Sequence, residues 1–287
     1  MKKTIFIIIS VVLISMLVLA GCDILVRADG DNKTGSGNLE TRQYDFSEFN
    51  QVEIGDAFEY TIVQSDTFSV SITADDNLFD DIRVTKNGQR LDIDLKPLFH
   101  FGVTTLEAAI TMPRLTGLES SGATHGTISG FDSADNLDLE ISGASRVNLM
   151  DITTGDIEGS ISGASSVEID ISADDVALEL SGASRVDGSL VANDMLMDVS
   201  GASRIQLDGS ANDIEIDTSG ASLIRFSDFT VDNADISLSG ASTCKIHVTG
   251  RIDIDLSGAS KLTYIGTPIL GGINLSGGST IENEAGD

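Results

Sequence analysis

A short motif, Ser-Gly-Ala-Ser or a close variant, recurs through the second half of the chain at intervals of 18 to 21 residues. Its copies begin at Ser121, Ser142, Ser162, Ser181, Ser200, Ser219, Ser239, Ser257 and Ser276. A nearly constant period in this range is the signature of a solenoid, in which each repeat stacks on the one before it. The repeat therefore constrains the fold more than any other feature of the sequence.

Apolar residues hold fixed positions on both sides of the motif. They stand five, three and one residues before its first Ser, as in Leu137, Leu139 and Ile141. Another apolar column lies five residues after that Ser, in Val147 and its equivalents, and it includes Cys244. Alternation with a period of two predicts strands with one buried face rather than helices. We therefore expect Cys244 to be a small buried hydrophobe rather than a nucleophile.

The residues of the motif itself are typical of a tight corner. Gly at the second position, as in Gly143 and Gly182, suits a corner that needs unusual backbone dihedrals or a close backbone approach. Ser at the fourth position, as in Ser145 and Ser184, is expected to form a hydrogen-bonded ladder along the corners. Short strands joined by such corners predict an all-β fold, a right-handed parallel β-helix with rungs of about 19 residues.

The part of the chain before the motif keeps the strand pattern without the repeat. Leu91-Asp92-Ile93-Asp94-Leu95 alternates, and Asn87-Gly88 between two strands signals a tight turn. We predict one β-helical domain over residues 39–287, with irregular first rungs over 39–118 and regular repeats over 119–287. A leucine-rich repeat has a similar period, but its Leu-x-x-Leu frame is absent from this sequence.

These features resemble a known family. Met112-Pro113-Arg114-Leu115 leads into Ser120-Ser121-Gly122-Ala123, and a ladder of Ser-Gly-Ala-Ser corners follows. Together with the strand-rich start, they are similar to the putative auto-transporter adhesin, head GIN domain family, over nearly the whole chain after its first 45 residues. The resemblance implies a β-helical fold in a bacterial envelope protein, often a lipoprotein, and it brings no catalytic motif.

The first 22 residues are typical of an export signal. Lys2 and Lys3 precede an apolar run from Ile5 to Leu19, which is short for a permanent membrane span. The sequence Leu19-Ala20-Gly21-Cys22 then resembles the lipobox of bacterial lipoproteins, in which the Cys is acylated after cleavage. We predict a signal peptide over residues 1–21 and lipidation at Cys22. The alternative is an ordinary signal peptide with a chance Cys.

The chain after Cys22 is polar and Gly-rich, which predicts a flexible tether over residues 22–38. An exported, membrane-anchored lipoprotein of the bacterial cell envelope is therefore expected. Asp23 resembles the inner-membrane retention signal of Gram-negative lipoproteins, so the membrane and leaflet depend on the source.

The composition is strongly acidic. Seventeen Lys and Arg residues against 45 Asp and Glu residues give a formal net charge of −28. A surface this negative repels phosphate backbones, which argues against nucleic acid as a partner. An apolar fraction of 41% is too high for a disordered acidic chain, so a folded protein is expected.

Charged residues recur at two positions of the repeat. Two residues before the motif lies an acidic ladder: Glu119, Glu140, Glu179, Asp198, Asp217 and Asp255. Four residues after its first Ser lies an adjacent basic column, with His125 in the same position: Arg146, Arg185, Arg204 and Lys261. Carboxylates about 5 Å apart could share Ca²⁺ or bind a charged ligand. The alternative is a solvated face on which the basic residues relieve repulsion.

These observations predict a non-catalytic envelope protein that presents a β-helical surface for adhesion, ligand binding or scaffolding. The partner could be a polysaccharide or another envelope protein. The alternatives are a polysaccharide lyase or hydrolase and a purely structural spacer. Near-constant repeat spacing leaves no long insertion to build a catalytic groove, and the absence of Trp leaves little for stacking sugars. No catalytic residue is assigned, and no cofactor beyond the possible Ca²⁺.

The last copy of the motif begins at Ser276 and is followed by only a few residues of this sequence. We expect the last rung to leave an open strand edge. Glu282, Asn283, Glu284 and Asp287 could blunt this edge, or the edge could pair end to end with another copy of the chain.

Overall fold

The structure is a computed structural model that describes residues 32–96 and 100–284. The chain divides into two compact units. In the first, β1 (Asn32–Lys33) pairs in parallel with β8 (His100–Phe101). The second unit, Thr34–Pro97 and Val103–Asp287, contains the solenoid.

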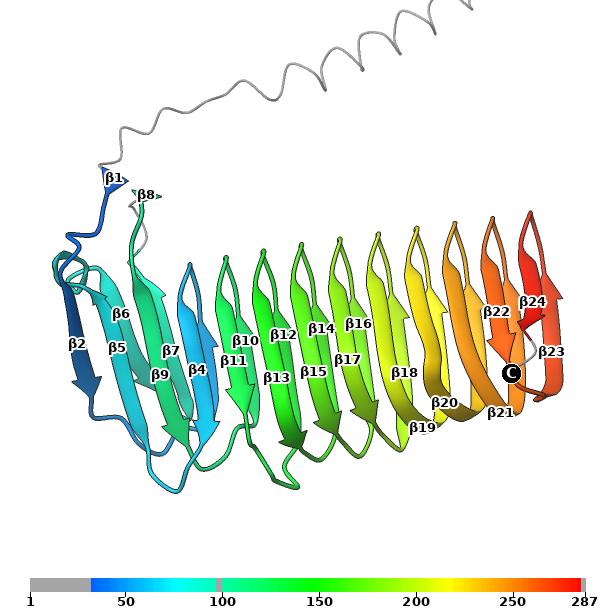
Figure 1. Ribbon diagram of the computed structural model, residues 1–287, viewed down its shortest axis with the longest axis horizontal. Coiled ribbons are helices and arrows are strands. Elements are labelled where there is room, and N and C mark those ends of the chain that lie inside the picture. Colours follow the sequence, from blue (N-terminus) through cyan, green and yellow to red (C-terminus); the bar gives the residue numbers. More distant parts are fainter. Residues whose placement is uncertain (1–31, 97–99, 285–287) are drawn as a thin grey trace, which may run out of the picture. The chain divides into compact units, whose positions relative to one another are not determined.

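The strands of the solenoid form one continuous 22-stranded sheet that folds at the corners into two faces, which we call sheet A and sheet B (Figure 1). Sheet A contains the strands that precede the corners: β7 (Arg90–Leu95), β3 (Gln51–Ile54), β10 (Gly117–Ser120), β12 (Leu137–Ile141), β14 (Ile157–Ile161), β16 (Val176–Leu180), β18 (Asp194–Val199) and β23 (Ile269–Leu275). Sheet B contains the strands that follow them: β9 (Leu106–Met112), β4 (Glu59–Gln64), β11 (His125–Ser129), β13 (Arg146–Thr153), β15 (Ser166–Ser172), β17 (Arg185–Val191), β22 (Lys261–Ile265) and β24 (Thr280–Glu284).

Three long strands belong to both sheets because they continue through the second corner of the rung. They are β19 (Arg204–Thr218), β20 (Leu223–Leu238) and β21 (Thr243–Leu256). Neighbouring rungs pair in parallel, and the solenoid has about nine turns with rungs about 19 residues apart. The predicted all-β solenoid is confirmed.

Glycine is required at the corners for two reasons. The nine corner glycines have φ between 69° and 79°, a left-handed conformation that other residues rarely adopt. In addition, a Cβ at Gly182 would overlap the carbonyl oxygen of Gly163 in the preceding rung. That same oxygen accepts a hydrogen bond from the Ala183 N–H at 2.8 Å, so the corners stack through their backbones.

The corner serines do something different from the predicted ladder. The Ser145 hydroxyl donates to the carbonyl oxygen of Ser142 in its own corner at 2.8 Å, and the other copies through Ser279 repeat this bond. These side chains therefore close each corner from within, and the backbone joins every corner to the next. Cross-rung side-chain bonds add to this only locally, as from Thr124 to Ser145 at 3.0 Å and from Ser184 to the Ile161 carbonyl oxygen at 3.3 Å.

The core lies between the two sheets, where the predicted columns point inward. Leu137, Ile141 and Val147 are buried, and so are the large apolar residues at the same positions in the rungs from β10 to β22. Cys244 is fully buried in this column, and burial raises the pKa of its thiol to about 12. The interpretation of Cys244 as a buried hydrophobe is confirmed.

The rungs are not stacked in chain order at the N-terminal end. β3 pairs with β7 on one side and β10 on the other, and β4 likewise lies between β9 and β11. The first rung along the chain is thus inserted between the second and the third (Figure 1). This arrangement comes from long-range pairing that the local strand pattern does not encode.

Antiparallel strands close this end of the solenoid. β2 (Leu39–Tyr44) pairs with β5 (Ser69–Asp75), which pairs with β9. β6 (Ile82–Asn87) forms a hairpin with β7 through Gly88, whose φ is 65°, so the predicted Asn87-Gly88 turn is confirmed. A 3₁₀ turn, η2 (Asp76–Leu78), lies between β5 and β6 and buries Leu78 completely.

A further corner, which the motif search misses, joins β3 to β4 at residues 55–58. Asp56 takes the place of the corner Gly with φ of 65°, a conformation that Asp tolerates better than most residues. Its carbonyl oxygen accepts the Ala123 N–H at 2.5 Å, as corner glycines do. Its carboxylate accepts the Leu95 N–H at 2.6 Å, which ties the corner to β7.

Residues 36–38, which the sequence assigns to the tether, are bound to this closed end. The Gly37 N–H donates to the Asp75 carboxylate at 2.8 Å, and the Ser36 N–H donates to the Asn77 side chain at 3.0 Å. The predicted signal peptide, Cys22 and Asp23 lie outside the described residues. Of the residues described, none forms a helix with the length and apolarity needed to cross a membrane.

Candidate binding surface

The outer face of sheet A carries the predicted acidic ladder in one straight column. The register places Glu119 beside Glu140, and Glu179 beside Asp198, which is beside Asp217. Ser160 and Ser237 interrupt the column, and Asp255 continues it. Successive strands of a sheet lie about 4.8 Å apart, so these carboxylates stack at that spacing along the solenoid.

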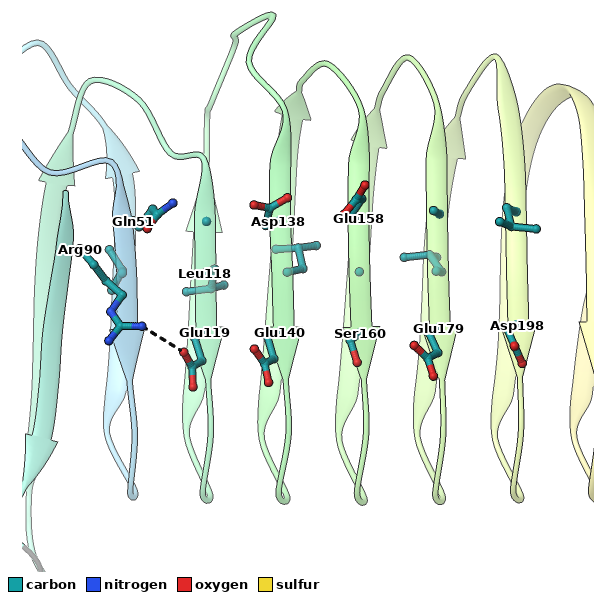
Figure 2. Close-up of a pocket in the computed structure, with 17 residues that line it drawn as sticks. Gln51, Arg90, Leu118, Glu119, Asp138, Glu140, Glu158, Ser160, Glu179 and Asp198 are labelled. Carbon is teal, nitrogen blue, oxygen red and sulfur yellow. Dashed lines mark ion pairs between the residues drawn. The ribbon is translucent and has the colours of Figure 1, made fainter. Parts of the chain in front are cut away.

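The same column extends past the repeat into the N-terminal part. Glu53 lies beside Glu119, and Asp92 lies beside Glu53. Arg90 binds all three: its guanidinium is 2.7 Å from Asp92, 2.8 Å from Glu53 and 3.7 Å from Glu119. Figure 2 shows Arg90 at this end of the line of carboxylates. The sequence did not reveal this extension because β3 and β7 lack the motif.

The basic column lies on the other sheet. Arg146, Arg185, Arg204 and Lys261 occupy the outer face of sheet B, beyond the corner, and are not adjacent to the acidic ladder. Arg185 pairs with Asp187 on its own strand, and Lys261 pairs with Glu282 at 2.8 Å. The ion pairs of this column thus join acids of sheet B and not the ladder, because the tight corner turns the chain from sheet A onto sheet B.

Two more acidic columns accompany the ladder on sheet A. The second lies two residues earlier on each strand, and the third lies at the second corner. The second column contains Asp138, Glu158, Glu215, Asp235 and Asp253. The third contains Asn136, Asp156, Asp175, Asp194, Asp213 and Asn233.

The third column is also a structural element. The Asp194 N–H donates to the Asp175 carboxylate at 3.3 Å, and the Asp213 N–H donates to Asp194 at the same distance. Each side chain thus accepts a backbone N–H from the next rung, as Asx residues do in turns. A recurring Asp or Asn six residues before the motif is the sequence signal that marks this ladder.

A groove runs along sheet A between the first and second columns, with a volume of about 780 Å³ (Figure 2). A second groove of about 590 Å³ runs between the second and third columns. Both share Glu158, Ala177 and Leu196, and the Leu196 side chain is 49% exposed. Ala177 and Leu196 thus form a short apolar patch within the second column, between Glu158 and Glu215, and carboxylate columns lie on both sides of it.

Few cations neutralise this surface. In residues 32–96 and 100–284, ion pairs reach sheet A carboxylates only from Arg90 and Arg83 near one end and from Arg251 near the other. Arg251 binds Asp253 at 2.6 Å. Within the same residues no three His, Cys, Asp or Glu side chains are grouped so that they could hold a metal ion. The carboxylates form lines rather than a chelating cluster.

Mutual repulsion is visible in the pKa of Asp235. Burial raises it, and the neighbouring carboxylates Asp253, Asp217 and Asp255 raise it further. The pKa of Asp253 is lowered instead, because the Arg251 guanidinium and the Gly272 N–H donate hydrogen bonds to its carboxylate. The field on this face therefore favours any positive group that binds there.

Comparison with known proteins identifies the family. Residues 48–187 and 166–268 match the family model described as putative auto-transporter adhesin, head GIN domain. The chain belongs to this family. The resemblance seen in the sequence is thus confirmed, and the match covers most of the solenoid. Among curated proteins there is no match.

Solved structures share the fold of this head GIN domain protein. A putative adhesin from Parabacteroides distasonis has a TM-score of 0.70 and 16% identity, covering 88% of this chain and 100% of its own. A putative adhesin from Parabacteroides merdae has a TM-score of 0.68 and 18% identity, covering 88% and 99%. A putative lipid binding protein from P. distasonis has a TM-score of 0.66 and 17% identity, with the same coverage. In all three pairs, the match covers nearly the whole of the solved chain.

Proposed function

We propose that this chain is a non-catalytic adhesion protein of the bacterial cell envelope that binds an elongated, positively charged partner along the outer face of sheet A. The observation that carries the proposal is the set of carboxylate columns, which few cations neutralise, around the short apolar patch of Ala177 and Leu196. Family membership and the adhesins of similar fold support the adhesive role.

The geometry favours a long ligand over a small one. The carboxylates repeat once per rung, so an extended chain with regularly spaced positive groups meets many of them at once. Each exposed ion pair contributes only about 0.2–1 kcal/mol. Affinity therefore depends on how many ion pairs form at once. Ala177 and Leu196 add apolar contact in the middle of the acidic face.

The test uses residues 32–287 and two cationic polymers, polylysine and chitosan, with neutral dextran as the reference. Binding is measured at several salt concentrations, because exposed charge pairs are screened beyond about 8 Å at physiological ionic strength. We expect both cationic polymers to bind, dextran not to bind, and affinity to fall as salt rises. Binding of dextran alone, or of nothing, contradicts the proposal and favours a different surface or a structural spacer.

A pair of matched variants tests whether the face or the net charge matters. The first variant combines Glu140→Gln, Glu158→Gln, Glu179→Gln and Asp198→Asn on sheet A. The control combines Glu59→Gln, Glu168→Gln, Asp170→Asn and Asp208→Asn on sheet B, with the same change in charge. Four lost pairs at about 0.3–0.5 kcal/mol each give about a tenfold loss of affinity for the first variant. An equal loss in the control would contradict the proposal.

The same incubations test the enzymatic alternative. Polysaccharide recovered after incubation is sized by mass spectrometry. Chains of unchanged length agree with a non-catalytic protein, whereas shortened chains support a lyase or hydrolase and overturn the first part of the proposal.

We also propose that acylation of Cys22 anchors the protein after removal of residues 1–21. The lipobox-like sequence before Cys22 supports this, as does the frequency of lipoproteins in the family it resembles. Cells expressing the full chain are fed an alkyne-labelled fatty acid, and the label is followed on the protein. Wild type should be labelled and found with membranes, and Cys22→Ser should lose both properties. Labelling of Cys22→Ser at the wild-type level contradicts the anchor.

A further inference from the structure

The C-terminal end of the solenoid exposes side chains that are interior everywhere else. Leu270, Ile273 and Leu275 on β23 are 47%, 42% and 48% exposed. The residues in the same columns one rung earlier, such as Ile252 and Leu256, are fully buried. Among residues 32–96 and 100–284, nothing covers the far side of this rung.

The backbone of the end rung is also unpaired on that side. β23 pairs with β21, and β24 pairs with β22, and the other edge of each strand has no strand partner among the described residues. An open edge of a parallel sheet offers a row of N–H and C=O groups with which a strand of another chain can pair. The end therefore offers both apolar contact and hydrogen bonds.

Charge is absent from this end on sheet A. β23 has the sequence Ile-Leu-Gly-Gly-Ile-Asn-Leu, and Asn274 follows Asp255 in the first column where earlier rungs carry acids. On sheet B, Glu282 and Glu284 are held by Lys261 at 2.8 Å and Lys245 at 2.7 Å. The glutamates expected to blunt the edge are thus neutralised by lysines of the preceding two rungs.

We infer that this end binds the same end of a second copy, forming a closed dimer with the two solenoids end to end. The net charge of −28 opposes most contacts between two copies of the chain. The end-to-end contact is an exception because it keeps the acidic columns of the two copies apart. Across the junction, Asp255 of one copy and Asp255 of the other are separated by three rung spacings, about 14 Å. That distance exceeds the screening length of about 8 Å at physiological salt.

The opposite end of the solenoid is unsuited to the same contact. Its edge strand on sheet B, β2, carries Glu40 and Arg42, which pair with each other at 2.8 Å. Its edge strand on sheet A, β6, carries Arg83 and Lys86. Charged edge strands oppose strand addition. Pairing of like ends around a two-fold axis therefore gives a closed dimer rather than an open filament.

The contact is small. A strand of seven residues is about 23 Å long, and packed sheets are about 10 Å apart, so the end rung offers less area than a typical stable interface. We therefore expect a reversible dimer that dissociates on dilution through the micromolar range.

Sedimentation equilibrium of residues 32–287 over a concentration series tests the inference. The mass of wild type should double as concentration rises, and Leu275→Lys should remain a monomer. Leu39→Lys is the matched control, since Leu39 is 57% exposed on β2 at the closed end, and it should dimerise like wild type. A monomer at every concentration, a dimer in Leu275→Lys, or oligomers beyond a dimer each overturn the inference.

Hydrogen–deuterium exchange of wild type gives a test that does not depend on the folding of a variant. The amides of residues 269–275 and 280–284 should exchange more slowly at high protein concentration than at low concentration. The amides of β2 and β6 should exchange at the same rate at both. An unchanged rate in β23 and β24 overturns the inference.

Discussion

The N-terminal part of the solenoid and its repeats differ in how their strands are paired and in how their acidic side chains are neutralised. In residues 34–115, hairpins and antiparallel strands close the fold, and Arg90 neutralises the carboxylates around it. In residues 117–265, most strand residues lie beside their equivalents one rung before and after, and most acids have no cation. A substitution in the repeats therefore affects contacts with the backbone or the charged side chains of the next rung. The effect of a substitution near the N-terminus depends instead on the residues that contact it locally.

The largest difference is expected between two glycines. Gly182→Ala and Gly88→Ala both place a side chain at a positive φ, of 74° and 65°. At Gly182 the new Cβ also overlaps the carbonyl oxygen of Gly163, whereas at Gly88 nothing lies within 4 Å. We expect a loss of about 3–4 kcal/mol in the free energy of unfolding for Gly182→Ala and about 1 kcal/mol for Gly88→Ala.

Urea denaturation followed by circular dichroism measures both losses. Unchanged m-values are the control, because they show that the same fold is unfolding. Equal losses in the two variants would contradict the idea that stacking, rather than φ alone, requires the corner glycine.

A smaller difference is expected between two Arg–Asp pairs with the same spacing. Arg90 binds Asp92, whose side chain is only 9% exposed, and Arg251 binds Asp253, which is 34% exposed. Arg90→Ala leaves a nearly buried carboxylate without its cation, which costs about 1–2 kcal/mol after allowance for the exposure of Arg90. Arg251→Ala should cause no change that denaturation can resolve. A larger loss for Arg251→Ala than for Arg90→Ala would reverse the comparison.

The smallest effect concerns pH. The pKa of Asp235 is raised, so its ionisation opposes folding, and that penalty disappears as pH falls below the ordinary Asp range. The pKa of Asp253 is lowered, so its ionisation favours folding, and that contribution is lost as pH falls. At pH 7 we expect Asp235→Asn to stabilise the fold by about 0.5 kcal/mol or less, and Asp253→Asn to destabilise it.

Denaturation midpoints at pH 7 and at pH 3 separate the two effects. Both variants should move towards wild type at the lower pH, because the native carboxyl group is then increasingly neutral. A shift of the same sign in both variants at pH 7 would show that the columns respond to net charge alone and not to their local partners.

The repeat made most of the solenoid predictable. The alternation around each motif predicted the inward columns from Leu137 to Leu262 and the glycine corners, because face and corner depend on residues close in sequence. The acidic ladder was predictable in the same way. The corner at Asp56 was missed because Gly55-Asp56-Ala57-Phe58 shares only its Ala with the Ser-Gly-Ala-Ser motif, and Asp56 takes the left-handed position that Gly has in the other corners.

The position of the basic column shows that a short spacing in the sequence does not ensure proximity in a solenoid. Arg146 follows Glu140 by only six residues, yet a tight corner between them turns the chain onto the other sheet. Spacing along the chain therefore predicted proximity where the fold puts the two columns on opposite faces.

The sequence by itself determined the parallel solenoid, its rung length, its buried columns and its acidic ladder, because each of these follows from a local pattern repeated nine times. Only the tertiary structure decided that β3 and β4 enter between β7/β9 and β10/β11, that Glu53 and Asp92 extend the ladder, and that Leu275 is left exposed at the end. The physical reason is that such neighbours come from pairings between distant segments, whose register depends on how the whole chain packs.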